Sequence, residues 1–164
     1  MSKVKIKERL PWEDRWHEPS LEQLLEPQKA TARKPLETIL GELETIDNLD
    51  RELVWYGPAW RWTIQYALQG QQVTGENPAV AYIVPNPENA LVLVPLTDEM
   101  VDELPMRRLN KAIREGIRSA KCAYQQHWAT WSPSSQAEAE NLVDLVRRKI
   151  AFVTGEEPAD KKSD

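Results

Sequence analysis

The clearest chemical pattern in the sequence is a row of five cationic side chains spaced four, three, four and three residues apart: Arg107, Lys111, Arg114, Arg118 and Lys121. This spacing places all five on one face of an α-helix, opposite an apolar face. Such a row can bind an anion, whether a nucleotide, a nucleic acid or an acidic partner. It is also typical of a solvated helix face whose cations pair with nearby acids such as Glu115. Both interpretations stay open.

Aromatic residues form the second pattern, within residues 53–68 (LVWYGPAWRWTIQYAL). Large side chains there alternate with smaller or polar ones, which predicts a strand with one aromatic face. That face holds Trp60, Trp62 and Tyr66, and Tyr82 from a later strand is expected beside it. It could line a pocket for a flat or apolar ligand, or it could be ordinary core. Arg61 points to the other face, either as a ligand anchor or as an exposed strand residue.

No residue set amounts to a catalytic signature. His17 and His127 are the only histidines, and neither has a second ligand at metal spacing. The single cysteine, Cys122, has Lys121 beside it, but no histidine lies at the spacing of a known cysteine-enzyme family. Phosphate-loop, dinucleotide-binding, serine-hydrolase and zinc-protease motifs are absent. The sequence therefore predicts no catalytic residue, no metal and no cofactor, although a triad assembled only in space needs no local motif.

Several elements must position these residues. Strands are expected at residues 53–56, 60–68, 79–84, 90–96 and 126–131, with a turn at Gly57-Pro58. The strands at 79–84 and 90–96 form a hairpin and are apolar at nearly every position, which is typical of strands buried on both faces. Trp128 and Trp131, three residues apart, are expected on opposite faces of the last strand. Helices are expected at residues 21–25 and 36–46, after Thr97, over 109–120, and from Ser135 to Gly155.

This order of elements predicts the α+β class. We expect a curved antiparallel sheet of four to five strands, a meander plus a last strand, packed by N-terminal, middle and C-terminal helices. Residues 1–35 form an N-terminal extension, with residues 26–35 as a linker. The domain covers residues 36–153, and residues 154–164 form a disordered tail. Trp12 and Trp16 are expected to fold back onto the domain, because exposed indoles are costly.

Composition narrows the class of protein. The chain has 164 residues, a net charge of −5 and a pI near 5.2. A mildly acidic surface argues against general affinity for DNA or anionic membranes. The longest apolar runs are about seven residues, whereas a membrane-spanning helix needs roughly 20. One cysteine allows no internal disulfide. We expect a cytoplasmic protein of bacterial type.

Short motifs in the chain resemble a known family. They are residues 55–62 (WYGPAWRW), 80–85 (VAYIVP) and 113–120 (IREGIRSA), then His127-Trp128, then a closing helix that reaches residues 148–150 (RKI). In this order they resemble the family called domain of unknown function 3788 and the broader YdhG-like group of small bacterial proteins. The resemblance covers about residues 36–153. It implies an α+β fold with a curved antiparallel sheet, and it implies no activity and no site residue.

The sequence favours a non-enzymatic domain that binds a ligand or a protein through its aromatic sheet. A second copy of the chain could close one face of that sheet, which predicts a homodimer as one arrangement. A small apolar or anionic ligand is the other partner that the residues suggest. The alternatives are a small enzyme or anion binder that uses Arg114 and Arg118, and a nucleic-acid binder on the same face.

Overall fold

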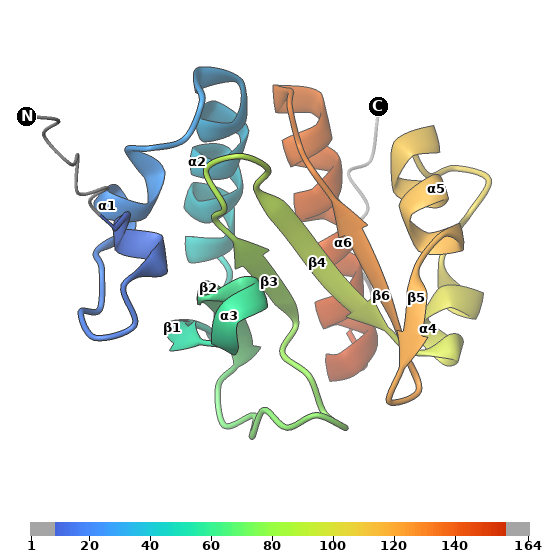
Figure 1. The fold of residues 1–164 in the computed structure, drawn as a ribbon. Coiled ribbons are helices and arrows are strands. Elements are labelled where there is room, and N and C mark those ends of the chain that lie inside the picture. The colour runs from blue at the N-terminus through green and yellow to red at the C-terminus, as the bar shows by residue number, and fades with distance from the viewer. Residues whose placement is uncertain (1–8, 157–164) are drawn as a thin grey trace, which may run out of the picture.

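A single sheet organises the molecule. The computed structural model describes residues 9–156, and within them six antiparallel strands pair in the order β1-β2-β3-β4-β6-β5 (Figure 1). The strands are β1 (Leu49–Trp55), β2 (Trp62–Leu68), β3 (Ala81–Val84), β4 (Leu91–Leu96), β5 (Lys121–Ala123) and β6 (Gln126–Trp131). The predicted α+β class and the antiparallel sheet packed by N-terminal, middle and C-terminal helices are confirmed.

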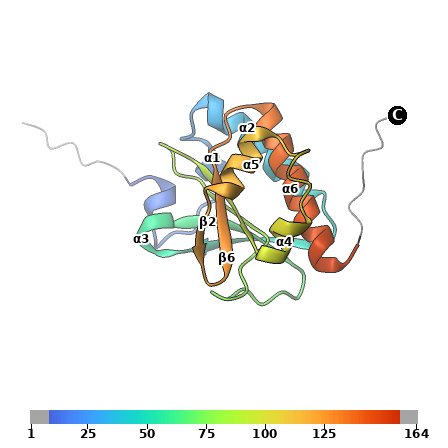
Figure 2. The ribbon, with the colours of Figure 1, turned by 90° about the vertical axis from the view of Figure 1, so that its right-hand side faces the viewer.

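Helices cover one face of this sheet. The longer ones, α2 (Ala30–Glu44) and α6 (Gln136–Thr154), pack side by side on that face, whereas α3 (Gly57–Trp60) lies on the other (Figure 2). The remaining helical segments are η1 (Pro11–Glu13), α1 (Leu21–Leu25), α4 (Asp98–Glu103) and α5 (Lys111–Arg118). We call the side under α2 and α6 the helix face and the other side the open face.

Strand alternation assigns each side chain to a face. Ile64 pairs with Ile83, and Ile83 with Val92, so these three residues share the helix face, where each is at most 1% exposed. Their neighbours Gln65, Tyr82 and Leu93 point to the open face by the same register. Trp128 and Trp131 lie on opposite faces of β6, as predicted.

The segment before β2 differs from expectation. Residues 57–60 form the short helix α3 instead of the start of a strand, and β2 begins only at Trp62. Gly57 has φ +83° and Pro58 lies at the start of the helix, where its fixed φ favours a helical turn. Arg61, with φ +57°, turns the chain back into the sheet. The alternation that placed Trp60 on the same face as Trp62 was therefore wrong.

Helix α2 begins at Ala30, so the predicted linker over residues 26–35 was wrong from that point. Pro35 lies inside the helix and is buried together with Leu36. A proline there removes one backbone hydrogen bond. Burial of Pro35 and Leu36 against the core offsets this loss. A local sequence pattern does not report such tertiary packing, so the helix start was not predicted.

Strand β5 was not predicted. Its three residues are exposed and carry no apolar alternation. A tight turn through Tyr124 and Gln125, which have φ of +52° and +63°, joins it to β6. Lys121 is the first residue of β5, and α5 ends at Arg118 and not at residue 120 as predicted. With β5 the sheet has six strands among the described residues.

The N-terminal segment docks only in part. Trp12 is 6% exposed and its Nε1 donates to the carbonyl of Trp60 at 3.0 Å. Trp16 is 76% exposed, so the expectation that both indoles pack back was wrong for Trp16. The first eight residues of the predicted N-terminal extension lie outside the described residues, as does the predicted tail from residue 157 onward. None of the helices in residues 9–156 has the length and apolar character needed to cross a membrane.

Candidate functional site

Four aromatic side chains meet on the open face, and we call them the aromatic cluster: Tyr56, Trp60, Tyr82 and Trp128. The ring centroids of Trp60, Tyr82 and Trp128 form a triangle with sides of 5.5, 5.8 and 6.2 Å. Tyr56 packs edge-on against both Trp60 and Tyr82. These separations are typical of stabilising aromatic contacts. Strands β3 and β6 and helix α3 each contribute one ring, and Tyr56 lies between β1 and α3.

The tyrosines of the cluster are neutral. Burial raises the pKa of Tyr82, and burial also raises the pKa of Tyr56 well above its usual value. The Tyr82 hydroxyl oxygen accepts a hydrogen bond from the Ala79 backbone N–H at 2.9 Å, and the Tyr56 hydroxyl donates to Gln65. Both hydroxyls are therefore hydrogen-bonded within the protein, and the rings of the cluster form a platform on the open face.

A groove of about 620 Å³ runs beside this platform. Trp60, Leu93 and Trp128 line it, together with Leu91 and Thr130. The opposite wall comes from the end of α5, the segment after it, β5 and the turn that follows β5: Gly116, Ser119, Ala120, Lys121, Ala123 and Tyr124. Lys121 pairs with Trp128 across β5 and β6, so the two side chains project to the same side. Lys121 is the one charged residue among the described residues that line the groove.

The residues predicted for an aromatic site do not all meet there. Trp60 and Tyr82 lie at the groove or in its platform, but Trp62 and Tyr66 face the helices. Tyr66 is 1% exposed, and burial raises its pKa. Arg61 pairs with Glu13 at 2.9 Å, and its guanidinium lies over the Trp12 ring at 4.8 Å. These contacts make Arg61 an anchor for the N-terminal segment.

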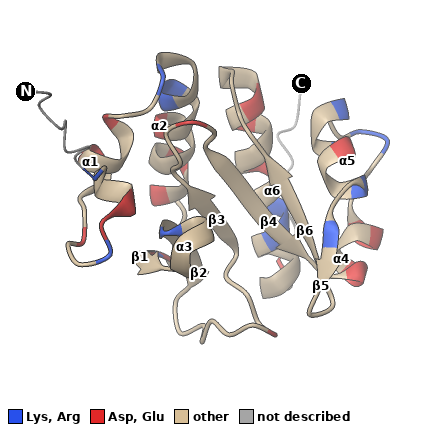
Figure 3. Cartoon of the chain, in the orientation of Figure 1, with Lys and Arg blue, Asp and Glu red and all other residues tan. Residues whose placement is uncertain are grey.

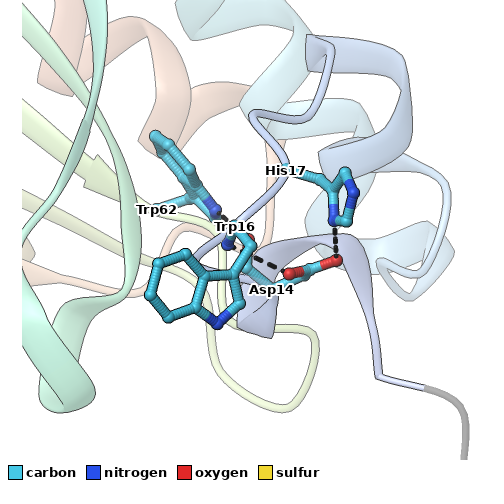
Figure 4. Close-up of polar contacts among 4 residues, drawn as sticks. All are labelled: Asp14, Trp16, His17 and Trp62. Atoms are coloured by element: carbon cyan, nitrogen blue, oxygen red, sulfur yellow. Dashed lines mark hydrogen bonds and ion pairs between the residues drawn. The ribbon is translucent and has the colours of Figure 1, made fainter.

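Trp62 is held by the same segment. Its Nε1 donates to the Asp14 carbonyl at 2.7 Å (Figure 4). The Asp14 carboxylate accepts from the Trp16 backbone N–H at 3.1 Å and contacts His17 Nδ1 at 2.8 Å. The His17 hydrogen bond lowers the pKa of Asp14. Asp14 thus orders the turn that positions its own carbonyl against Trp62, which is a structural task.

The predicted row of five cations is broken. Helix α5 contains only Lys111, Arg114 and Arg118, because Arg107 precedes it and Lys121 lies in β5 (Figure 3). Lys111 lies 3.9 Å from Glu115, and Arg114 Nη1 donates to the Met106 carbonyl at 3.3 Å. The prediction of one continuous cationic helix face was therefore wrong. Lys121 joins the aromatic groove instead.

Sequence reasoning missed Trp128 as a partner of Trp60 and Tyr82. The sequence indicated that Trp128 and Trp131 lie on opposite faces of the strand, but it did not indicate that β6 pairs with β4.

In residues 9–156, no three His, Cys, Asp or Glu side chains are grouped so that they could hold a metal ion.

Comparison with protein-family models, with curated proteins and with solved structures finds no match for this chain. The resemblance to domain of unknown function 3788 and the YdhG-like group therefore stays a prediction.

Proposed function

We propose that this protein is a binding domain whose open-face groove takes a small, flat or apolar molecule that carries an acidic group. The observation that carries the proposal is the apolar groove between the aromatic cluster and α5, with Lys121 as its one charge. Small-molecule sites are typically concave and apolar, with few polar groups that fix orientation. The groove has this composition.

The charge and the rings suggest how the ligand would lie. An aromatic or alicyclic body would rest on Trp60 and Trp128, whose stiff side chains lose little entropy on binding. Its carboxylate or sulfonate would then reach Lys121, which projects from the same side as Trp128. In the described residues no carboxylate lies within ion-pair distance of Lys121, so the ammonium is available to a ligand.

Other occupants fit less well. A nucleic acid would need a continuous cationic surface, and the five predicted cations are divided between a turn, α5 and β5 on a chain of net charge −5. A second copy of the chain over the open face stays a candidate that the test below can reveal. The cytoplasmic location stays a prediction of the composition.

The proposal is tested with two matched probes, naphthoate and its uncharged analogue naphthalenemethanol. Melting temperatures are measured for the parent protein and for Trp128→Ala, Lys121→Glu and the control Trp16→Ala, each against its own ligand-free melt. A ligand at about 100 times its dissociation constant adds roughly 2.7 kcal/mol to the folded state. Naphthoate should raise the melting temperature of the parent and of the control, but not that of Trp128→Ala.

Lys121→Glu should remove the response to naphthoate and keep the response to the alcohol. Equal responses in the parent and in Trp128→Ala would contradict the proposal, and so would no response to either probe. Sedimentation of the same samples would show whether a second copy occupies the face, because a dimer that Trp128→Ala dissociates would replace the small-ligand account.

A further inference from the structure

Three side chains with catalytic potential meet at the edge of the sheet, away from the aromatic groove. Cys122 Sγ lies 3.3 Å from His127 Nδ1, and His127 Nε2 lies 2.5 Å from Asp98 Oδ1. We infer that Cys122, His127 and Asp98 form a nucleophilic thiol site for acyl transfer from neutral or cationic esters and thioesters. This inference does not depend on the proposed ligand groove.

The fold brings the three residues together from three segments. Cys122 and His127 are direct partners across β5 and β6, so their side chains project to one side, while the next pair, Lys121 and Trp128, projects to the other. His127 also pairs with Leu96 at the end of β4. Asp98 follows two residues later at the start of α4, whose N-cap is Thr97. The sequence separations conceal this meeting, and only the strand register creates it.

The hydrogen-bond chemistry assigns each residue a role. An ionised Asp98 only accepts, so the proton between it and His127 belongs to Nε2. In the neutral imidazole, Nδ1 is then the acceptor, and it faces the Cys122 thiol. A nucleophile, a base beside it and a third group that orients the base form the arrangement that activates serine and cysteine nucleophiles. Asp98 acts here as a positioning residue.

Space for a substrate adjoins the thiol. A pocket of about 730 Å³ is lined by the three residues and by Glu76, Glu99, Tyr124, Gln125 and Gln126, together with Thr97. The described lining includes the carboxylates of Glu76, Asp98 and Glu99 and no Lys or Arg. Anionic acyl donors would be repelled by these charges, which favours neutral or cationic ones.

The reaction balances without an added oxidant or reductant. The sulfur of Cys122 attacks the carbonyl carbon, forming an S–C bond as the thiol proton passes to His127 Nδ1. The bond from that carbon to the leaving alkoxide or thiolate then breaks, and His127 gives the leaving group the proton. Water subsequently attacks the thioester on Cys122, which releases a carboxylic acid and restores the thiol.

The test uses nitrophenyl acetate, a neutral activated ester, on the full chain. The parent should become acetylated on Cys122, seen by intact mass and peptide mapping, and should release nitrophenolate. Cys122→Ser should lose the modification. His127→Ala should slow acetylation by about 100-fold or more, the range expected for loss of a general base. Circular dichroism melts establish that each variant is folded.

Asp98→Asn tests the positioning role, with Asp102→Asn, an exposed carboxylate of the same helix outside the pocket, as the matched control. Asp98→Asn should slow acetylation and change its dependence on pH, whereas Asp102→Asn should leave both near those of the parent. The same rate in the parent, in His127→Ala and in the urea-unfolded chain would overturn the inference, because Cys122 would then be an ordinary surface thiol. Acetylation of other residues with Cys122 untouched would overturn it as well.

Discussion

At the residue scale, Lys149 is a buried cation that has no carboxylate partner among residues 9–156. It is 6% exposed, and its Nζ donates to the backbone carbonyls of Val80 at 3.0 Å and Ala79 at 3.3 Å. Burial lowers the pKa of Lys149 to about 7. The two carbonyls lie just before β3, so the side chain of α6 fixes the entry of that strand into the sheet. Because only the protonated side chain carries a charge, the free-energy cost of burying Lys149 depends on pH.

The stability of the protein should therefore rise with pH above neutrality. In the unfolded chain the Lys149 pKa returns to near 10.5, so between pH 7 and 10 the unfolded state binds more protons than the folded state. The free energy of unfolding should increase by up to roughly 1.4 kcal/mol per pH unit in this range. Below pH 7 Lys149 is protonated in both the folded and the unfolded state, and the free-energy cost of burying its ammonium group is present in full. Urea unfolding of the parent and of Lys149→Met from pH 6 to 10 measures the difference.

The slope specific to Lys149 is the difference between the two proteins, because the other titrating groups are common to both. Lys149→Met should show the shallower slope. Parallel curves for the two proteins would mean that the buried ammonium carries no such penalty.

At the scale of elements, α5 is fixed to the sheet edge by Trp131. The Trp131 Nε1 donates to the Ala112 carbonyl at 3.0 Å, and the indole lies where a side chain at Gly116 would be. Ile113 and Ile117 are buried on the same helix. Glycine at position 116 is therefore required by close packing and not by an unusual backbone conformation.

Gly116→Ala should destabilise the fold by about 1–3 kcal/mol, because the added methyl group overlaps the Trp131 ring. Gly41→Ala in α2 is the matched control, since a Cβ there meets nothing within 4 Å. Alanine in that exposed helix position should stabilise by about 0.5–1 kcal/mol. Chemical denaturation gives both values. A Gly116→Ala variant as stable as Gly41→Ala would contradict the packing of α5.

Elements with strong local signals could be predicted from sequence. Ser20, Thr97 and Ser135 each cap a helix, as their positions indicated. The apolar runs that contain β3 and β4 also pair as the sequence suggested. The helical conformation at Trp60 and the strand β5 could not be predicted, because both depend on tertiary packing. The local alternation around Trp60 favoured a strand, and β5 has no apolar face at all.

The candidate sites depended even more on tertiary pairing. Trp128 reaches Tyr82 only because β6 pairs with β4 across a gap of 29 residues between those strands. The same pairing brings His127 to Asp98. Residue types indicated that rings and cations could do chemistry, but the strand order decides which of them meet.

At the scale of the whole molecule, the N-terminal segment contacts both α3 and the start of β2. The indole Nε1 of Trp12 donates a hydrogen bond to the Trp60 carbonyl, and that of Trp62 donates to the Asp14 carbonyl. Arg61 forms an ion pair with Glu13. Trp60 belongs to the aromatic cluster, so this segment supports the groove from outside it. Its docking thus couples residues 12–14 to the proposed ligand site.

Trp12→Ala should cost about 3–5 kcal/mol of stability, as for other buried large-to-small changes, and should leave the Trp60 carbonyl without its donor. Trp16→Ala should change stability by no more than about 0.5 kcal/mol, because the indole is exposed. Thermal or urea unfolding compares the two. Equal losses would show that Trp16 also packs on the domain, and no loss for Trp12 would show that the segment does not stabilise it.

The proposed division of the sheet into a structural helix face and a ligand-binding open face is tested most directly by indole N–H signals in a nuclear magnetic resonance spectrum. The chain has seven tryptophans, and single Trp→Phe variants assign them. During a naphthoate titration, the signals of Trp60 and Trp128 should shift together and saturate, while those of Trp55 and Trp62 stay in place. Movement of Trp55 and Trp62 without Trp60 and Trp128, or no movement at all, would contradict the account.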